Sequence, residues 1–535
     1  MKLSISILLS LAMVTLGACP AATAQKVKPE PMEQGKYQPT WESLSSYECP
    51  DWYRDAKFGI WAHWGPQCEP EAGDWYARNM YYPGQWQQEV HLKKYGDPKD
   101  FGFKDVIHEW KAERWQPDSL IRFYKSVGAK FFMTLANHHD NFDLWDSEYQ
   151  PWNSVNMGPK RDVVGEWAKA CRKYGLPLGV SVHASHAWTW YEGSQRYDGK
   201  LAKADGKGKW WEGYDPQDLY QQSHERSKNS WDVNAIHSQW AWGNGASQPS
   251  EAFKTNVYNR TLDLINRYSP DVLYFDDTVL PFYPISDEGV RILAHMYNKS
   301  LKDNKGETHA VVTGKILEDR HKEAMVWDVE RGIPDRPQEK PWQTCTCLGS
   351  WHYDRGLYDR NGYKPASQVV KMLVDIVSKN GTLLLSVPLR GSGEIDEKEV
   401  AILKELKAWL DTNGESVFAT RPWTVFGEGP LAEQANPINA QGFNEGRQAY
   451  SAADIRYVKK GEVVYATALG WPDNGVVRLE TLRKDSPYCH REVKGVELLG
   501  HGSVDYDRDG TSLTIYLPKD KPNPIAPVFK VTFLE

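Results

Sequence analysis

Residues 271–277 read Asp-Val-Leu-Tyr-Phe-Asp-Asp, a short apolar run that is followed at once by two acidic residues. Four consecutive aliphatic or aromatic residues between polar ends predict a buried β-strand. Upstream of this run, Phe253, Val257, Leu264 and Tyr268 recur at helical spacing, so we expect a helix before the strand. A helix that leads into a buried strand is the repeating unit of parallel α/β folds.

The same alternation of β-rich runs and amphipathic helices extends from about residue 50 to residue 390. One further helix is predicted over residues 161–174, with Gly175 at its end. Repeated β-then-α units predict a parallel sheet, and at this length we expect a (β/α)8 barrel or a distorted form of it. A doubly wound open sheet is the alternative, but no glycine-rich dinucleotide turn follows the first strand. The predicted strands are residues 58–61, 131–135, 177–182, 271–275, 310–312, 325–327 and 382–385.

Polar side chains stand at the ends of five of these strands. In (β/α)8 barrels the active site lies at the carboxyl ends of the strands. A series of ionisable groups at these ends therefore predicts a catalytic site. The residues are His63, the run His138-His139-Asp140, His183, the pair Asp276-Asp277, and Asp328 with Glu330.

Length and composition set the broad class. The chain has 535 residues, more than one hydrophobic core normally organises, so two domains are expected. Its net charge is −7 without a basic block, which argues against nucleic acid or an anionic membrane surface as the main partner. It contains 24 Trp and 28 Tyr, many of them beside Gly, Asp, Asn or His. Flat rings beside hydrogen-bonding groups suit carbohydrate, although a core also absorbs aromatic residues. A long insertion at about residues 190–250 is rich in Trp, which favours a binding role for it.

The N-terminus has the form of an export signal. Residues 1–24 combine Lys2, an apolar stretch too short to span a bilayer, and a small-residue cleavage site at residues 22–24. A competing interpretation is a bacterial lipoprotein signal, because residues 16–19 read Leu-Gly-Ala-Cys and would place a lipid on Cys19. Either signal takes the mature protein out of the cytoplasm, into the periplasm or to a lipid anchor at the outer membrane. Apart from such an anchor, we expect no membrane contact.

Two domains follow the signal. Residues 40–412 carry the β/α pattern and form the predicted catalytic domain. Residues 413–535 show short alternating strands that predict a small β-sandwich, which we expect mainly to brace the barrel. Six cysteines follow the signal, and we expect them to be buried free thiols because their spacing predicts no zinc site. The sequence indicates neither a cofactor nor a metal, and it leaves the oligomeric state open.

The strand-end carboxylates suggest hydrolysis of a glycosidic bond. That reaction uses two carboxyl groups beside the anomeric carbon, one that attacks or activates water and one that protonates the leaving oxygen. Asp276 and Asp277 are the first candidates. Because side chains alternate along a strand, only one of the two can point into the barrel mouth.

Five segments in sequence order point to one family. They are residues 56–65 (Ala-Lys-Phe-Gly-Ile-Trp-Ala-His-Trp-Gly), 137–142 (Asn-His-His-Asp-Asn-Phe), 272–276 (Val-Leu-Tyr-Phe-Asp), 380–387 (Asn-Gly-Thr-Leu-Leu-Leu-Ser-Val) and 420–423 (Thr-Arg-Pro-Trp). They resemble, respectively, the first-strand motif, the paired histidines, the nucleophile strand, the last barrel strand and the entry to the C-terminal sandwich of the family-29 glycoside hydrolases, the α-L-fucosidases. The resemblance spans about residues 40–535.

The resemblance assigns roles to individual residues. Asp276 would be the nucleophile that forms a covalent fucosyl-enzyme intermediate with retention of configuration. His63, His138 and His139 would hydrogen-bond the fucose hydroxyls, with Trp75 beside them, since an imidazole can both donate and accept. Fucosidase chemistry requires no metal. The substrate-binding candidates are His63, Asp74, Trp75, His138, His139, His183, Tyr274 and Trp351.

Two positions depart from the family pattern. Asp74 replaces the usual Glu, which keeps the charge and shortens the reach. Residues 342–345 read Trp-Gln-Thr-Cys where many members have Trp-Glu-Thr-Cys, and an amide such as Gln343 cannot serve as a general acid. We therefore predict Glu330 as the acid/base, with Asp328 and Asp354 as lesser candidates.

The function expected from the sequence is an exo-acting α-L-fucosidase that removes terminal fucose from oligosaccharides or polysaccharides by double displacement. The first alternative is the same machinery acting on α-L-galactose or another L-sugar, because L-galactose differs from fucose by one hydroxyl at C6. The second alternative is a fucose-binding protein that has lost hydrolysis together with the usual acid glutamate.

Overall fold

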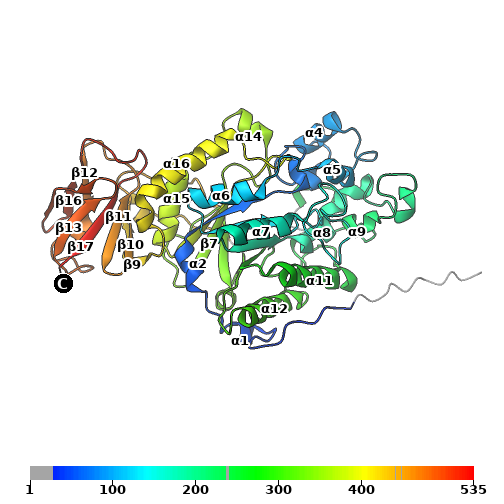
Figure 1. Ribbon diagram of the computed structural model, residues 1–535, viewed down its shortest axis with the longest axis horizontal. Helices are drawn as coiled ribbons and strands as arrows, with labels where there is room; N and C mark the ends of the chain where they lie inside the picture. The colour runs from blue at the N-terminus through cyan, green and yellow to red at the C-terminus, as the bar shows by residue number, and fades with distance from the viewer. Residues whose placement is uncertain (1–27, 236–239, 440, 448, 535) are drawn as a thin grey trace, which may run out of the picture.

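A closed barrel of eight parallel strands forms the centre of the protein (Figure 1). The structure is a computed structural model and describes residues 28–235, 240–439, 441–447 and 449–534. The strands follow one another around the barrel in chain order, and β8 pairs with β1 to close it. The predicted (β/α)8-like fold is therefore confirmed. The strands are β1 (Phe58–Ala62), β2 (Phe131–Leu135), β3 (Leu178–Val182), β4 (Val272–Phe275), β5 (Val311–Gly314), β6 (Val326–Glu330), β7 (Trp342–Cys347) and β8 (Gly381–Ser386).

Strand β7 was not predicted. Its sequence, Trp-Gln-Thr-Cys-Thr-Cys, is largely polar, yet every one of its residues is buried. It pairs with β6 on one side and with β8 on the other, so its backbone groups are satisfied within the sheet. Strands β1, β2, β3, β4 and β8 are short, largely apolar runs that are buried, as expected for a parallel sheet that is covered by helices.

Helices surround the barrel. Helix α7 begins after Asp162, whose side chain accepts from the backbone N–H of Gly165, and ends at Gly175 with φ +64°. It confirms the helix predicted over residues 161–174. The longer helices are α4 (Trp86–Lys94), α6 (Pro117–Val127), α7 (Val163–Tyr174), α11 (Glu251–Tyr268), α12 (Glu288–Asp303), α15 (Ala366–Ser378) and α16 (Glu397–Asn413). The shorter ones are α1 (Trp41–Leu44), α2 (Asp51–Ala56), α3 (Tyr76–Asn79), α5 (Phe103–Glu109), α8 (Ala187–Trp190), α9 (Pro216–Tyr220), α13 (Asp319–Lys322), α14 (Arg355–Asp359) and α17 (Pro430–Glu433).

Two antiparallel sheets form the C-terminal part of the chain, at the left of Figure 1. They enclose a hydrophobic core of their own, which confirms the predicted β-sandwich. A buried ion pair between Arg456 of β10 and Asp375 of α15 connects the sandwich to the barrel. The six-stranded sheet has the order β14 (Gly502–Ser503), β13 (Val493–Leu498), β17 (Val528–Phe533), β11 (Val463–Ala468), β10 (Ile455–Lys460) and β9 (Arg421–Glu428); the three-stranded sheet has the order β12 (Val476–Leu479), β16 (Leu513–Tyr516) and β15 (Tyr506–Arg508).

Three further expectations concern the N-terminal export signal, the cysteines and membrane-spanning segments. The export signal at residues 1–24, including Cys19, lies outside the described residues. All six later cysteines are free thiols, and each is buried except Cys49, which is half-buried. In the part of the chain that the structure describes, no helix has the length and apolar character needed to cross a bilayer.

Candidate active site

A cavity of about 710 Å³ opens at the carboxyl ends of the barrel strands. This size lies within the about 300–1,000 Å³ that is typical of small-molecule sites. Nine of the residues predicted for the site line it: His63, Asp74, Trp75, His138, His183, Tyr274, Asp276, Glu330 and Trp351. His139, Asp140, Asp277, Asp328 and Asp354 are not among its lining residues. The cavity is also lined by residues that the sequence did not assign to the site: Trp61, Trp240, Ala241, Asn244, Thr278, Lys315, Ile316, His352, Asn439, Gln441 and Phe443.

Asp276 follows β4 directly and carries the most densely hydrogen-bonded carboxylate of the cavity. Its Oδ2 lies 3.0 Å from Nε2 of His139 and 3.1 Å from Nδ1 of His183, while its Oδ1 contacts the ammonium group of Lys315. Burial raises the pKa of Asp276, but the charge of Lys315 and the two histidine hydrogen bonds outweigh it and hold the pKa well below its usual range. Asp276 is therefore an anion whose direction is fixed by its hydrogen bonds.

Lys315 joins Asp276 to the second carboxylate of the cavity. It is the first residue after β5, and Glu330 is the last residue of β6. The Nζ of Lys315 lies 2.5 Å from Oε2 of Glu330 and also contacts Oδ1 of Asp276. Burial lowers the pKa of Lys315, but the two carboxylates raise it well above its usual value, so the ammonium stays charged. Two carboxylates on different strands thus share one cation.

Four histidines bring imidazole nitrogens to the cavity. Neither ring nitrogen of His63 has a hydrogen-bond partner among the described residues, and the same holds for Nε2 of His183 and of His352. Burial lowers the pKa of His63 and of His138 well below the usual value, and it lowers the pKa of His183 to about 4. A neutral imidazole offers one donor and one acceptor. These rings are therefore suited to bind neighbouring hydroxyl groups of a neutral ligand.

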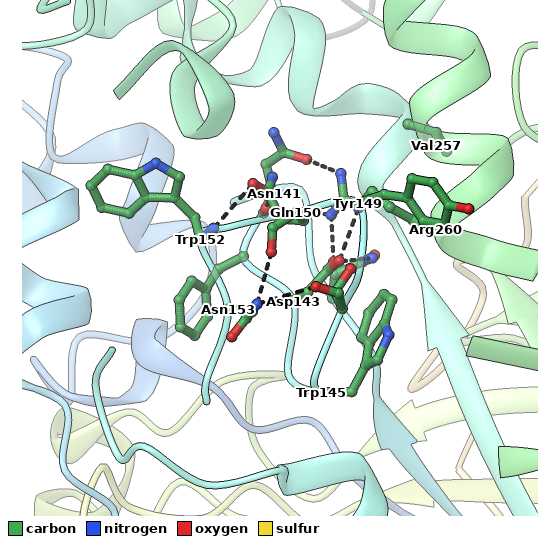
Figure 2. A network of polar contacts seen from close by, with 12 residues as sticks. Asn141, Asp143, Trp145, Tyr149, Gln150, Trp152, Asn153, Val257 and Arg260 are labelled. Carbon is green, nitrogen blue, oxygen red and sulfur yellow. Dashed lines mark hydrogen bonds and ion pairs between the residues drawn. The ribbon is translucent and has the colours of Figure 1, made fainter. Parts of the chain in front are cut away.

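A buried polar network holds the loop after β2, which carries the paired histidines (Figure 2). Arg260 of α11 donates to Oδ1 of Asn141 at 2.6 Å and to Oδ2 of Asp143 at 3.0 Å. Asn137 continues the network, because it donates to Oδ1 of Asp143 at 3.0 Å and accepts from the backbone N–H of His183 at 3.0 Å. The loop and the end of β3 are therefore fixed to one another and to α11.

Comparison with known proteins assigns this arrangement to a family. The sequence model of Alpha-L-fucosidase matches residues 24–415. The chain belongs to the α-L-fucosidase family. A second model, that of the Alpha-L-fucosidase C-terminal domain, matches residues 449–532. The enzyme is thus a glycoside hydrolase, as the sequence motifs predicted.

Individual relatives agree with this assignment. The enzyme is 26% identical over 519 residues to human tissue alpha-L-fucosidase, covering 93% of this chain and 91% of the human protein. It is 27% identical over 454 residues to an alpha-L-fucosidase of Branchiostoma floridae, covering 83% and 84% of the two chains. The structure of Thermotoga maritima alpha-fucosidase in complex with fucose is similar, with a TM-score of 0.66 at 24% identity over 93% of this chain and 100% of that one. At this identity the structural likeness shows a shared fold.

His139 contacts Asp276 and does not line the cavity of the enzyme. It was expected to hydrogen-bond the sugar, but it is not among the residues that line the cavity. Its Nδ1 lies 2.8 Å from the carbonyl oxygen of His183 and its Nε2 faces Asp276. His138 lines the cavity, whereas both ring nitrogens of His139 are used in contacts with the backbone of His183 and with Asp276. His139 therefore links the carboxylate of Asp276 to the backbone of His183 and so helps to position it.

Asp277 also points away from the cavity, as alternation predicted. Its Oδ1 accepts from Oγ of Ser185 at 2.6 Å and lies 3.0 Å from Nε2 of His186. The ring of His186 lies between two tryptophans of the insertion, 4.0 Å from Trp240 and 4.8 Å from Trp242 between centroids. Through this stack the insertion places Trp240 at the cavity, which agrees with the binding role predicted for it.

Gln343 lies inside the barrel and not at the cavity. It accepts from the hydroxyl of Tyr53 at 2.7 Å and donates to Oδ1 of Asp328 at 2.6 Å. Burial raises the pKa of Asp328 to about 6, and this carboxylate also accepts from the thiol of Cys345 at 3.0 Å. The side chain of Gln343 thus bonds Tyr53 and Asp328, neither of which lines the cavity.

Three carboxylates of the described residues line the cavity: Asp74, Asp276 and Glu330. Asp354, a lesser candidate for the acid, instead caps α14 by accepting from the backbone N–H of Gly356. Oδ1 of Asp74 accepts from the backbone N–H of His352 at 2.7 Å. One oxygen of Asp74 thus holds that loop, whereas Glu330 shares the ammonium group of Lys315 with Asp276.

Aromatic rings form the apolar walls. Trp61 lies 4.8 Å from Tyr274 and 5.7 Å from Trp351 between ring centroids. On another side, Trp75 lies 5.2 Å from Trp190 in an edge-to-face contact. Rings of this kind can cover the apolar face of a sugar.

Two clusters of the described residues have the composition of a metal site. The ligand atoms of His138, His139, His183 and Asp276 lie within 4.8 Å of one another, as do those of His63, His138 and His352. In the first cluster His139 and His183 already hydrogen-bond Asp276, and His138 contacts Gln67. Both clusters therefore present groups that serve equally to bind sugar hydroxyls.

Proposed function

We propose that the enzyme is an exo-acting, retaining α-L-fucosidase that releases terminal α-L-fucose by double displacement, with Asp276 as nucleophile and Glu330 as acid/base. The observation that carries this assignment is the shared ammonium group of Lys315, which contacts one carboxylate oxygen of each residue. Two oxygens in contact with one nitrogen lie no more than about 5 Å apart, which agrees with the carboxyl separation of about 5–5.5 Å in retaining enzymes and not with about 6.5–9.5 Å in inverting ones.

The two roles follow from the surroundings of each carboxylate. Asp276 has a pKa held well below its usual range and hydrogen bonds that fix its direction, which suits a nucleophile. Glu330 has one close cation and lines the same cavity, so it can reach the leaving oxygen as an acid must. In the second step the same residue would take a proton from water, which then attacks the glycosyl-enzyme bond.

The histidines and aromatic rings account for the sugar. The unpartnered nitrogens of His63 and His183 suit hydroxyl groups, and the rings of Trp61 and Trp351 suit the apolar parts of a deoxy sugar. The presence of both carboxylates in one cavity supports catalysis over mere binding. We further propose that the enzyme is exported and acts on fucosylated oligosaccharides or polysaccharides outside the cytoplasm, on the strength of the predicted signal at residues 1–24.

The test compares the parent protein with Asp276→Ala and Glu330→Ala on an aryl α-L-fucoside and on a fucosylated oligosaccharide. Asp276→Ala is expected to lower kcat/KM on both substrates by at least about 10³-fold, because the attacking group is gone. Glu330→Ala is expected to lower it by about 10²–10⁴-fold on the oligosaccharide and far less on the aryl fucoside, whose leaving group needs little protonation. NMR of the first product formed should show retained α configuration.

The control is Asp354→Ala, which removes a carboxylate outside the cavity. It should leave both activities near the parent values. An oligosaccharide activity that survives Glu330→Ala would assign the acid to another residue, and a β product would exclude double displacement. Hydrolysis of an aryl α-L-galactoside in preference to the fucoside would replace fucose by L-galactose as the substrate.

A further inference from the structure

One wall of the cavity comes from outside both regions that match the family. The matched regions are residues 24–415 and 449–532. Asn439, Gln441 and Phe443 lie between them, after the barrel and before β10, yet all three line the cavity. The site thus includes a wall that neither matched region supplies.

This wall is attached to the backbone of the acid/base residue itself. The N–H of Glu330 donates to the carbonyl oxygen of Gln441 at 2.9 Å, and the N–H of Phe443 donates to the carbonyl oxygen of Glu330 at 2.9 Å. Between these bonds, Gly442 and Glu330 form a parallel bridge. Gly442 has φ +135°, and a Cβ on it would lie 2.2 Å from the carbonyl oxygen of Glu330, so only glycine fits this close approach.

Further contacts downstream keep the wall in register with β6 and the loop that follows it. The N–H of Glu445 donates to the carbonyl oxygen of Arg331 at 3.0 Å. Asn444 bonds both backbone groups of Ile333, accepting at 2.9 Å and donating at 3.0 Å. The carboxylate of Glu445 forms an ion pair with Lys364 at 2.8 Å. The segment is therefore held by backbone and side-chain bonds on the same strand end that carries the acid.

Phe443 presents an apolar ring to solvent at this wall. Its side chain belongs to the few large hydrophobic ones that are exposed among the described residues, with 39% of its surface accessible. Its backbone has φ +56°, in the left-handed region that a residue with a large side chain rarely adopts. Such a conformation persists only where surrounding contacts impose it, and it occurs most often at functional sites.

From this placement we infer that Phe443, with the amides of Asn439 and Gln441, binds the leaving group, and that this group is a neutral pyranose sugar. The inference rests on the proposed function. The acid must touch the oxygen that joins fucose to the rest of the substrate, so the leaving sugar lies beside Glu330 and hence beside Phe443. The ring suits the apolar face of a pyranose, and uncharged amides suit hydroxyls better than carboxylate or sulfate groups.

The experiment separates the leaving group from the fucose. The parent and three variants, Phe443→Ala, Phe443→Tyr and Tyr488→Ala, are assayed on α-L-fucosyl fluoride, whose leaving group is one atom. They are also assayed on disaccharides in which fucose is linked to galactose, glucose or N-acetylglucosamine. Tyr488 is the matched control, because its ring is 49% exposed in the sandwich and does not line the cavity.

Phe443→Ala is expected to lower kcat/KM on the best disaccharide by about 3- to 30-fold and to stay within about twofold of the parent on the fluoride. Phe443→Tyr should retain the disaccharide activity, and Tyr488→Ala should change neither. An unchanged disaccharide activity in Phe443→Ala overturns the inference, and so does an equal loss on both substrates. A parent that cleaves the fluoride but no neutral disaccharide overturns the sugar class. A parent that cleaves neither substrate contradicts the proposed function itself.

Discussion

Replacing Lys315 with Met removes the cation that contacts both Asp276 and Glu330. The side chain of Lys315 is only 4% exposed, so water cannot readily take its place. In the parent, burial raises the pKa of Asp276 and the charge of Lys315 is the largest influence that lowers it. Without this charge, two carboxylates face one another in a buried site, and the pKa of Asp276 must rise.

The size of the change follows from Coulomb's law. Two unit charges about 4 Å apart at an effective dielectric constant of about 20 interact by about 4 kcal/mol, which equals about 3 pKa units. Rearrangement and water entry reduce this value, so we expect the pKa of Asp276 to rise by about 1–3 units. Since the nucleophile must be ionised, activity is lost on the acid side at correspondingly higher pH.

The measurement is the pH dependence of kcat/KM on an aryl α-L-fucoside for the parent, Lys315→Met and Lys315→Arg. The acid limb should move upward in Lys315→Met and much less in Lys315→Arg, which keeps the charge. Lys57→Met is the matched control, because Lys57 is also buried but does not line the cavity. A Lys315→Met variant that loses activity equally at every pH, with its acid limb in place, would refute the electrostatic role and leave Lys315 with a purely steric one.

The remaining predictions concern stability and metals. Arg260→Met should lower the free energy of unfolding by about 3–5 kcal/mol in a denaturant titration, because it leaves Asp143 buried without its cation. Arg267→Met, on the exposed side of the same helix, should cost less than about 1 kcal/mol, and equal losses would count against the network of Figure 2. Treatment with EDTA should leave activity within about twofold, because the nitrogens of His63 and His352 suit hydroxyls. If EDTA removed the activity and Zn²⁺ restored it, the result would instead show a metal in the histidine cluster.

The sequence predicted the barrel well wherever a strand is an apolar run. Strand β7 escaped this criterion because Gln343, Thr344 and Thr346 are buried polar residues whose partners come from other parts of the chain. The hydroxyl of Thr346, for example, donates to Glu445, far along the chain. Local hydrophobicity carries no information about such partners, so a strand of this kind becomes visible only once its neighbours are known.

The site was predictable where residues follow predicted strands, as His63, His183 and Asp276 do. Lys315 also follows a predicted strand, and the same rule would have found it. It was missed because a lysine at a strand end ordinarily extends into solvent, and its burial here depends on two carboxylates from other strands. Phe443 had no local signal at all, since its place at the cavity depends on backbone bonds to Glu330.

The backbone bonds between Glu330 and residues 441–443 bear on how such enzymes diversify. A graft that exchanges the C-terminal part of one relative for that of another, with the crossover after α16, would also exchange the segment that is bonded to Glu330, the proposed acid/base. Recombinants at this junction would inherit the cavity histidines from one parent and the proposed leaving-group wall from the other. A crossover after residue 447 would keep the histidines and residues 441–443 from the same parent, and it is the better junction for building chimeras.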